Sequence, residues 1–153
     1  MADEVKFEAA HSPAQDEIAP DTLFVDLLRC TGCWTCALSC MTGNNLKDGK
    51  FFVDVKTLGS GEGIDRPAGT WPNLHMSWMP VYRKSCIKCV DRTEAGELPY
   101  CVKNCPNKAL AYGEDVPAKV QAARERGARI FAQPAWEHTR EHVIYASPDR
   151  KIL

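Results

Sequence analysis

The stretch Cys30-Thr-Gly-Cys-Trp-Thr-Cys-Ala-Leu-Ser-Cys40 carries four cysteines in the spacing C-x2-C-x2-C-x3-C. A second quartet has the spacing C-x2-C-x11-C-x3-C and consists of Cys86, Cys89, Cys101 and Cys105, with Pro106 directly after it. Two residues between cysteines let consecutive sulfur atoms of a tight loop face one centre, whereas a fourth ligand has to come from elsewhere in the chain. The two quartets together therefore predict two [4Fe-4S] clusters.

The division of the eight cysteines follows the rule for bacterial ferredoxins. The first quartet has their spacing, and the second keeps their C-x3-C-P ending. In that pattern the fourth cysteine of a run binds the other cluster. One predicted cluster is therefore held by Cys30, Cys33, Cys36 and Cys105. The other predicted cluster is held by Cys40, Cys86, Cys89 and Cys101. Each C-x3-C pair is expected on a short helical turn that directs its two cysteines to different clusters.

Other uses of the cysteines stay open at this point. The second quartet could form an all-thiolate zinc site. Disulfide bonds, or a thioredoxin-like redox pair at Cys33 and Cys36, would each account for part of the pattern. A cluster of another nuclearity at one of the two sites is a further alternative. The spacing and the missing secretory signal favour metal binding by all eight cysteines.

The chain is long enough to fold around its own core, and its net charge is close to zero. A length of 153 residues is about one ordinary domain, and a net charge of -1 gives no electrostatic footprint for nucleic acid. No apolar run approaches the roughly 18 residues of a membrane span. The N-terminus has neither a secretory signal nor a twin-arginine signal. We therefore expect a cytoplasmic location without a direct membrane span, with export on a partner as an alternative.

We expect an α+β fold with a dicluster, bacterial-ferredoxin-like core of pseudo-twofold symmetry. Around this core we expect a flexible acidic N-terminal arm (residues 1–21) and a C-terminal helix and β-hairpin extension (residues 116–153) that packs on the core or on a partner. The ferredoxin-like domain would comprise residues 22–115, with an inserted loop at 58–75. Strands are predicted at 22–26, 51–57, 76–82, 109–112, 129–133 and 142–146. Helical segments are predicted at 37–41, 100–104 and 117–126, and a polar surface loop at 90–100.

Residues beside the cysteines indicate how the clusters would be tuned. Thr31, Gly32 and Thr35 let the first loop present backbone N–H groups to sulfur, which raises the potential of a cluster. Lys88 and Lys103 lie next to predicted ligands, and each either raises the potential electrostatically or is simply solvated. The sequence has no nucleophile–base pair, phosphate-binding glycine loop or dinucleotide fingerprint, so we predict no catalytic site in this chain.

Two longer stretches resemble one protein family. Residues 30–46 (Cys-Thr-Gly-Cys-Trp-Thr-Cys-Ala-Leu-Ser-Cys-Met-Thr-Gly-Asn-Asn-Leu) resemble the first cluster motif of the iron–sulfur subunits of dimethyl sulfoxide reductase-type molybdopterin oxidoreductases. Residues 86–114, with Arg92, Gly96 and Pro99 inside the long spacer, resemble the fourth motif of that family. The segment at 129–145 is similar to the one that follows this motif. The resemblance covers about residues 22–146.

The resemblance implies the function. Typical members of the family have sixteen cysteines and four clusters, whereas this chain has eight cysteines. It retains the two outer motifs, which share one ferredoxin module in the family, and lacks the inner pair. The resemblance implies an electron-transfer subunit that relays single electrons to or from a catalytic subunit with molybdenum- or tungsten-pterin. A further electron carrier or a membrane anchor subunit is a second expected partner. The alternatives are a free soluble dicluster ferredoxin and a structural zinc-binding interaction module.

Overall fold

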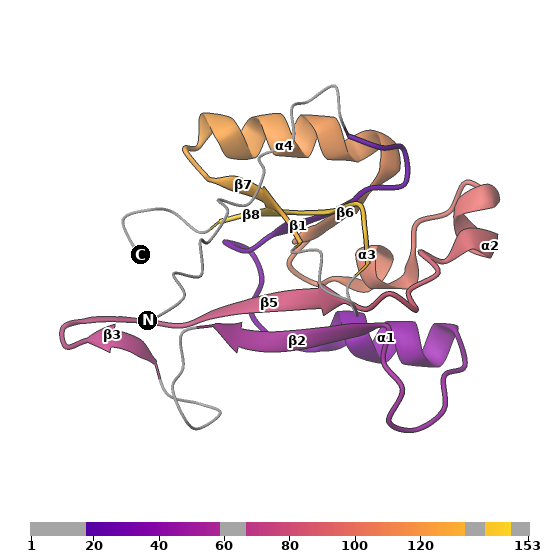
Figure 1. Ribbon diagram of the computed structural model, residues 1–153, viewed down its shortest axis with the longest axis horizontal. Coiled ribbons are helices and arrows are strands. Elements are labelled where there is room, and N and C mark those ends of the chain that lie inside the picture. Colours follow the sequence, from indigo (N-terminus) through magenta and orange to yellow (C-terminus); the bar gives the residue numbers. More distant parts are fainter. Residues whose placement is uncertain (1–17, 59–66, 134–139, 148–153) are drawn as a thin grey trace, which may run out of the picture.

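Strand β1 (Leu23–Asp26), which leads into the first cysteine loop, lies inside a four-stranded sheet with the order β6-β1-β8-β7. The computed structural model describes residues 18–58, 67–133 and 140–147. β1 pairs antiparallel with β6 (Leu110–Tyr112) and parallel with β8 (Val143–Ala146). β8 also pairs antiparallel with β7 (Ile130–Ala132). Strands from both ends of the described chain therefore form one sheet (Figure 1).

Both faces of this sheet are buried, because successive side chains of a strand point to opposite sides. Phe24 of β1 and Ile144 of β8 pack with Val120 of helix α4 (Val116–Glu125). Val25 and Tyr145 face the other way, into a core that includes several of the cysteines. The sheet thus separates an ordinary helix-covered core from the core that contains the cysteines.

The predicted C-terminal helix and strands are present, and their position in the sheet was not predicted. α4 has Pro117 in its first turn and is followed by Gly127 with φ 88°. Arg126 forms two hydrogen bonds of 3.1 Å to the carboxylate of Asp26, which joins the end of α4 to the end of β1. β8 lies between β1 and β7, so this segment supplies an inner strand of the main sheet. Residues 1–17 of the predicted arm and the last residues, 148–153, lie outside the described residues.

A second, antiparallel ribbon consists of β2 (Val53–Leu58) and β5 (Ser77–Tyr82). These strands confirm the predictions for residues 51–57 and 76–82. Pro80 pairs with Val55. In a ribbon of two strands each strand is an edge, so a residue without an N–H group is tolerated there.

The loop expected at residues 58–75 is wrong in its second half. Strands β3 (Ala68–Thr70) and β4 (Asn73–His75) form a small antiparallel hairpin, with Thr70 opposite Asn73. The composition is rich in Gly and Pro and therefore indicated a loop. Pro72, however, lies in the turn, where no ladder hydrogen bond is needed. Residues 59–66 lie outside the described residues.

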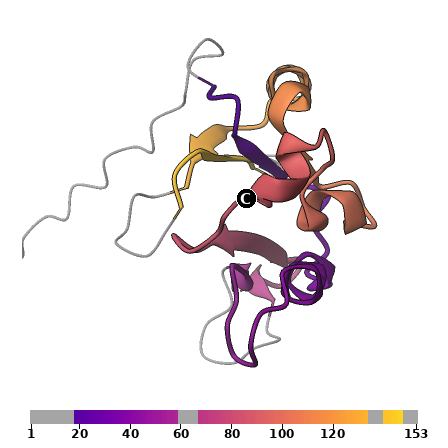
Figure 2. The same ribbon diagram turned by 90° about the vertical axis from the view of Figure 1, so that its right-hand side faces the viewer.

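Three helices follow the cysteine loops: α1 (Thr35–Gly43), α2 (Val90–Glu94) and α3 (Tyr100–Asn104). α3 has the predicted bounds, and α1 is longer than the predicted turn. The loop expected at 90–100 is wrong at its start, because its polar residues suit a solvated helical turn as well as a loop. Figure 2 has α1 (purple) and α4 (orange) at opposite ends, with the four-stranded sheet between them. Among the described residues, no helix is long and apolar enough to cross a membrane.

Candidate metal centres

Both cysteine loops end in a residue with positive φ directly before a helix. Trp34 (φ 63°) precedes α1, and Cys89 (φ 48°) precedes α2. Gly32 in the first loop and Lys88 in the second also have positive φ, at 69° and 50°. This left-handed backbone curls each loop back on itself, so that its cysteines face a common interior. The repeated cysteine spacing thus corresponds to a repeated backbone conformation.

The first pocket brings together four cysteines from distant parts of the chain: Cys30, Cys33, Cys36 and Cys105. The first three come from the loop before α1 and from its first turn, and Cys105 directly follows α3. Cys36 is buried, Cys33 is exposed, and the other two are half-buried. The empty volume of the pocket, including the part open to solvent, is about 340 Å³. These are the four residues that the spacing assigned to one cluster.

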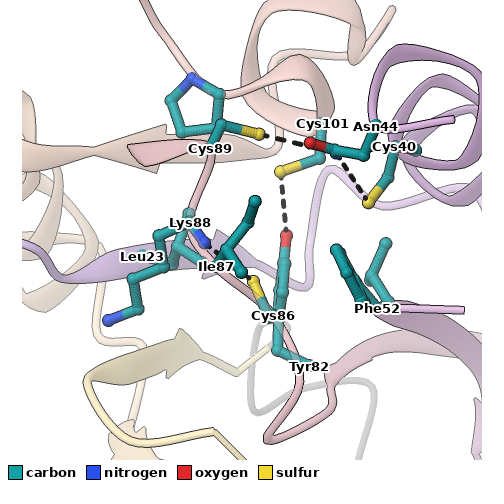
Figure 3. A pocket seen from close by; sticks show the side chains of 12 residues that line it. Leu23, Cys40, Asn44, Phe52, Tyr82, Cys86, Ile87, Lys88, Cys89 and Cys101 are labelled. Carbon is teal, nitrogen blue, oxygen red and sulfur yellow. Dashed lines mark hydrogen bonds between the residues drawn. The ribbon is translucent and has the colours of Figure 1, made fainter. Parts of the chain in front are cut away.

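The second pocket brings together the other four: Cys40, Cys86, Cys89 and Cys101. All four are buried, and their side chains surround a common space in Figure 3. The empty volume is about 320 Å³, similar to that of the first pocket. The structure therefore divides the cysteines into the two predicted sets, with none left over.

The packing of α1 against α3 explains why the sets cross. Gly43 at the end of α1 lies against Tyr100 at the start of α3, so closely that a Cβ atom on Gly43 would be 2.5 Å from the tyrosine ring. The helices therefore run in opposite directions. The early cysteine of α1, Cys36, consequently meets the late Cys105, while the late Cys40 meets the early Cys101.

Burial is the largest cause of the raised pKa values of the enclosed thiols. It raises the pKa of Cys36 to about 12 and that of Cys40 to about 11. The exposed Cys33 differs, because its hydrogen bond with the Thr35 side chain lowers its pKa. Metals bind the thiolate, so loading these pockets has to release the protons of the buried thiols.

Backbone donors reach the sulfur atoms at both sites, as the small residues of the first loop predicted. The N–H group of Gly32 opposes the effect of burial on the pKa of Cys30, and the N–H group of Ala109 lies 3.4 Å from the sulfur of Cys105. At the second site the N–H group of Lys88 lies 3.4 Å from the sulfur of Cys86.

Two side-chain donors at the second site were not predicted. The amide Nδ2 of Asn44 lies 3.5 Å from the sulfur of Cys40 and 3.9 Å from that of Cys89. The hydroxyl of Tyr82 lies 3.6 Å from the sulfur of Cys101 (Figure 3). Asn44 stands four residues after Cys40, a helical spacing that could have indicated this contact. For Tyr82 the sequence has no such signal, because the contact depends on how β5 meets α3.

The two lysines beside the ligands behave differently. The side chain of Lys88 is 5% exposed, so the solvated alternative is wrong for it, whereas Lys103 is exposed. The ammonium of Lys88 donates to the backbone oxygen of Asp21 at 2.7 Å and lies 3.3 Å from its carboxylate. The carboxylate also accepts a hydrogen bond of 2.8 Å from His142. Lys88 therefore connects the second cysteine loop to the segment before β1.

The zinc site considered from the sequence does not match the pockets. A zinc ion would need its thiolates about 2.3 Å from the metal. The zinc alternative also requires Cys105 beside Cys86, Cys89 and Cys101, and Cys105 lines the other pocket. A [4Fe-4S] cluster fills its own centre with iron and sulfide, so its cysteines stand farther apart.

Comparisons with known proteins agree with this chemistry. No family model matches the chain. It is 32% identical over 113 residues to an iron–sulfur subunit assigned to a dimethyl sulfoxide reductase in Halobacterium salinarum. It is 30% identical over 93 residues to a subunit of the selenate reductase of Mesobacillus selenatarsenatis. It is 32% identical over 93 residues to one chain of the anaerobic dimethyl sulfoxide reductase of Escherichia coli.

The matches cover most of this chain and a smaller part of the relatives. They extend over 70%, 61% and 60% of this chain, and over 39%, 26% and 40% of the respective relative. The chain therefore spans less than half the length of these relatives. Iron–sulfur subunits of an arsenate reductase and of formate dehydrogenases are also similar to it. Over the compared region, the chain is a relative of the iron–sulfur subunits of dimethyl sulfoxide reductase-type molybdopterin oxidoreductases.

Proposed function

We propose that this chain relays single electrons through two [4Fe-4S] clusters. The observation that carries the proposal is the sorting of all eight cysteines into two separate pockets of four. The pockets are neighbours, because α1 carries one cysteine of each set, and so does the segment of α3 with Cys105 directly after it. Each cluster would exchange one electron at a time, and closely spaced clusters allow sequential transfer.

The two pockets support an assignment of the ligands. The first cluster would be held by Cys30, Cys33, Cys36 and Cys105. The second cluster would be held by Cys40, Cys86, Cys89 and Cys101. The apolar residues around both pockets, such as Val55 and Leu23, would keep water away from the buried sulfur atoms. The repeated loop conformation and the opposed helices α1 and α3 support a pseudo-twofold, ferredoxin-like core, to which α4, β7 and β8 would be added.

We further propose a catalytic partner that contains molybdenum- or tungsten-pterin. The support is that the relatives bear the names of subunits of dimethyl sulfoxide and selenate reductases. The chain itself would have no catalytic site. Because it would hold two clusters, its relay would be shorter than that of a four-cluster subunit, and a further carrier or an anchor subunit would complete the route. A cytoplasmic location is part of this proposal.

Metal analysis of the protein purified without oxygen tests the clusters directly. We expect about eight iron and eight sulfide per chain, since each cluster contains four of each. The reduced protein should give the electron paramagnetic resonance (EPR) signals of two interacting centres. Two zinc ions per chain without sulfide would instead support the structural zinc module, and would end the electron-transfer proposal.

A free dicluster ferredoxin is the second candidate, because the described residues by themselves form both pockets of four cysteines. Affinity purification of the tagged chain from its native source separates the two. Recovery of a large pterin-containing chain in a stable ratio supports the subunit. A chain that purifies alone as a monomer, with both clusters intact, supports the free ferredoxin.

A further inference from the structure

A buried phenol lies against the second set of cysteines. Tyr82 ends β5 and is 1% exposed, and its hydroxyl donates to the sulfur of Cys101 at 3.6 Å (Figure 3). Cys101 is itself 6% exposed. A buried tyrosine hydroxyl normally finds a hydrogen-bond partner, usually an oxygen. The partner that the structure gives it is a predicted cluster ligand.

The backbone holds this tyrosine in place. Its N–H group donates to Oε1 of Gln133 at 3.0 Å, and its carbonyl oxygen accepts from Nε2 of Gln133 at 2.7 Å. The same carbonyl accepts from the N–H group of Arg140 at 2.9 Å, and Tyr82 pairs with Val53 across the ribbon. The glutamine is buried as well. These bonds fix the backbone of Tyr82, and its hydroxyl is directed at the sulfur of Cys101.

A donor in this position acts on the charge of the bound group. Hydrogen bonds to ligand sulfur are one of the factors that set the reduction potential of a cluster. Reduction adds negative charge, and a hydrogen bond to a more negative sulfur is stronger. Burial removes competing water, which makes the hydrogen bond electrostatically stronger. Burial raises the pKa of Tyr82 well above the ordinary tyrosine value of about 10, so the phenol keeps its proton at neutral pH and remains a donor.

The donors at the first site differ. There the side-chain contact to sulfur is between Cys33 and Thr35, where the thiol donates to the hydroxyl oxygen at 3.2 Å, and Cys33 is exposed to water. At an exposed position water can replace such a bond with little change in free energy, because one hydrogen-bond partner is merely exchanged for another. The Tyr82 hydroxyl, in contrast, donates to a buried cysteine of the second set, so its effect should be confined to the second site.

We propose that Tyr82 is a positioning residue that raises the reduction potential of the group held by Cys40, Cys86, Cys89 and Cys101 through its hydrogen bond to Cys101. This inference rests on the proposed function. It assigns the tyrosine a specific part in the relay: it makes the second centre easier to reduce and leaves the first unaffected.

Redox titration of the anaerobically purified full chain, followed by EPR, tests the inference. Tyr82→Phe removes only the hydroxyl. We expect the equilibrium constant for reduction of one centre to fall by up to about tenfold, which is about 59 mV for one electron. The midpoint potential of the other centre should not move, and iron and sulfide should stay at the wild-type content. Cys101→Ser identifies the affected centre, because it changes the signal of that centre alone.

Tyr145→Phe is the matched control. It also removes a buried tyrosine hydroxyl, but this one lies 2.7 Å from the carbonyl oxygen of Pro80 and 2.5 Å from Oε1 of Gln133, and its partners include no sulfur. Because Gln133 also holds the backbone of Tyr82, this control shows whether a disturbance of that support, without loss of the Tyr82 hydroxyl, is enough to shift a potential. We expect it to lower stability without shifting either potential. Equal shifts of both centres in Tyr82→Phe, or no shift in a fully loaded protein, would overturn the role of the tyrosine while leaving the two clusters in place. A wild-type chain without clusters would overturn the proposed function itself.

A second replacement keeps the test decisive if Tyr82→Phe does not assemble. Site-specific 3-fluorotyrosine at position 82 preserves the ring and the hydroxyl and makes the phenol more acidic, hence a stronger donor. We expect the potential of the same centre to rise. An unchanged or lower potential would contradict the inference.

Discussion

At the scale of single residues, Gly32 determines how tightly the first cysteine loop can curl. Its φ of 69° is a conformation that L side chains rarely adopt, and a Cβ atom there would lie 2.5 Å from Cγ of Trp78. Position 32 therefore needs both a residue that tolerates positive φ and a residue without a side chain. The conformation of the loop that carries Cys30 and Cys33 depends on both properties.

We predict that Gly32→Ala destabilises the protein and damages the first site. The left-handed backbone costs about 1–2 kcal/mol for an L residue, and overpacking against the indole about 1–3 kcal/mol. Gly49→Ala is the matched control, because Gly49 has φ 77° and a Cβ atom added to it would meet no atom within 4 Å. Chemical denaturation and iron analysis measure the outcome. Equal losses in the two variants would mean that the contact with Trp78 does not matter.

The sequence predicted which residues carry the chemistry and missed how some of them are supported. The spacing of the cysteines indicates tight loops in which consecutive sulfur atoms face one centre. Tyr82 reaches the sulfur of Cys101, and Asn44 that of Cys89, only through the packing of segments far apart in the chain. The burial of Lys88 likewise depends on Asp21, which is 67 residues away in the chain. Contacts of this kind cannot be predicted from local patterns.

At the scale of elements, the opposed directions of α1 and α3 decide the ligand sets. Each helix segment offers one cysteine to each pocket. Ser39 strengthens the pairing, since its hydroxyl lies 3.4 Å from the carbonyl oxygen of Tyr100. A loss of Cys40 or Cys105 should therefore affect the pocket that the cysteine lines and not the pocket of its nearest cysteine in sequence.

We predict that Cys40→Ser and Cys105→Ser damage different centres. Cys40→Ser should alter the centre of Cys86 and Cys89 and spare that of the first loop, whereas Cys105→Ser should do the reverse. Spectra of the two reduced variants, with iron counts, measure this. Ser39→Ala, in the same helix, controls for a general disturbance of α1. Loss of the first-loop centre in Cys40→Ser, with the other intact, would contradict the crossed sets.

Elements with a clear local pattern were predicted well. The strands around the cysteine quartets, together with α3 and α4, lie within one or two residues of their expected bounds. The hairpin of β3 and β4 and the short helix α2 were expected as loops. In both, the composition is polar or rich in Gly and Pro, and such composition also suits a turn between short strands or a solvated helical turn. Composition alone therefore did not distinguish the two.

At the scale of the whole molecule, β8 is the least expected feature. The sequence suggested an extension packed on a finished domain, whereas β8 pairs directly with β1 and lies inside the sheet. Its four residues are buried, and Tyr145 and Val143 face the core of the cysteines. The order of strands in the sheet could not be predicted, because pairing between segments far apart leaves no local pattern.

We predict that a chain ending at Asp115 does not hold both clusters. It would lose the buried side chains of α4, β7 and β8, each of which contributes about 1.5–3 kcal/mol. Together these contributions match a typical domain stability of about 5–15 kcal/mol. A chain ending at Ser147 is the control and should behave like the full chain. Thermal unfolding and iron content measure both. Cooperative unfolding of the short chain with full iron content would refute the prediction.

The crossed pockets also impose an order on biosynthesis. The first loop leaves the ribosome long before its fourth partner, because Cys105 is made 69 residues after Cys36. The second pocket likewise lacks one of its four cysteines until Cys101 has been made. Neither pocket is complete until the chain is about two-thirds made, and the two then become complete within four residues of each other. Iron delivery to this protein should therefore be a late and nearly simultaneous event for both centres, and a nascent chain stalled before Cys101 should carry neither.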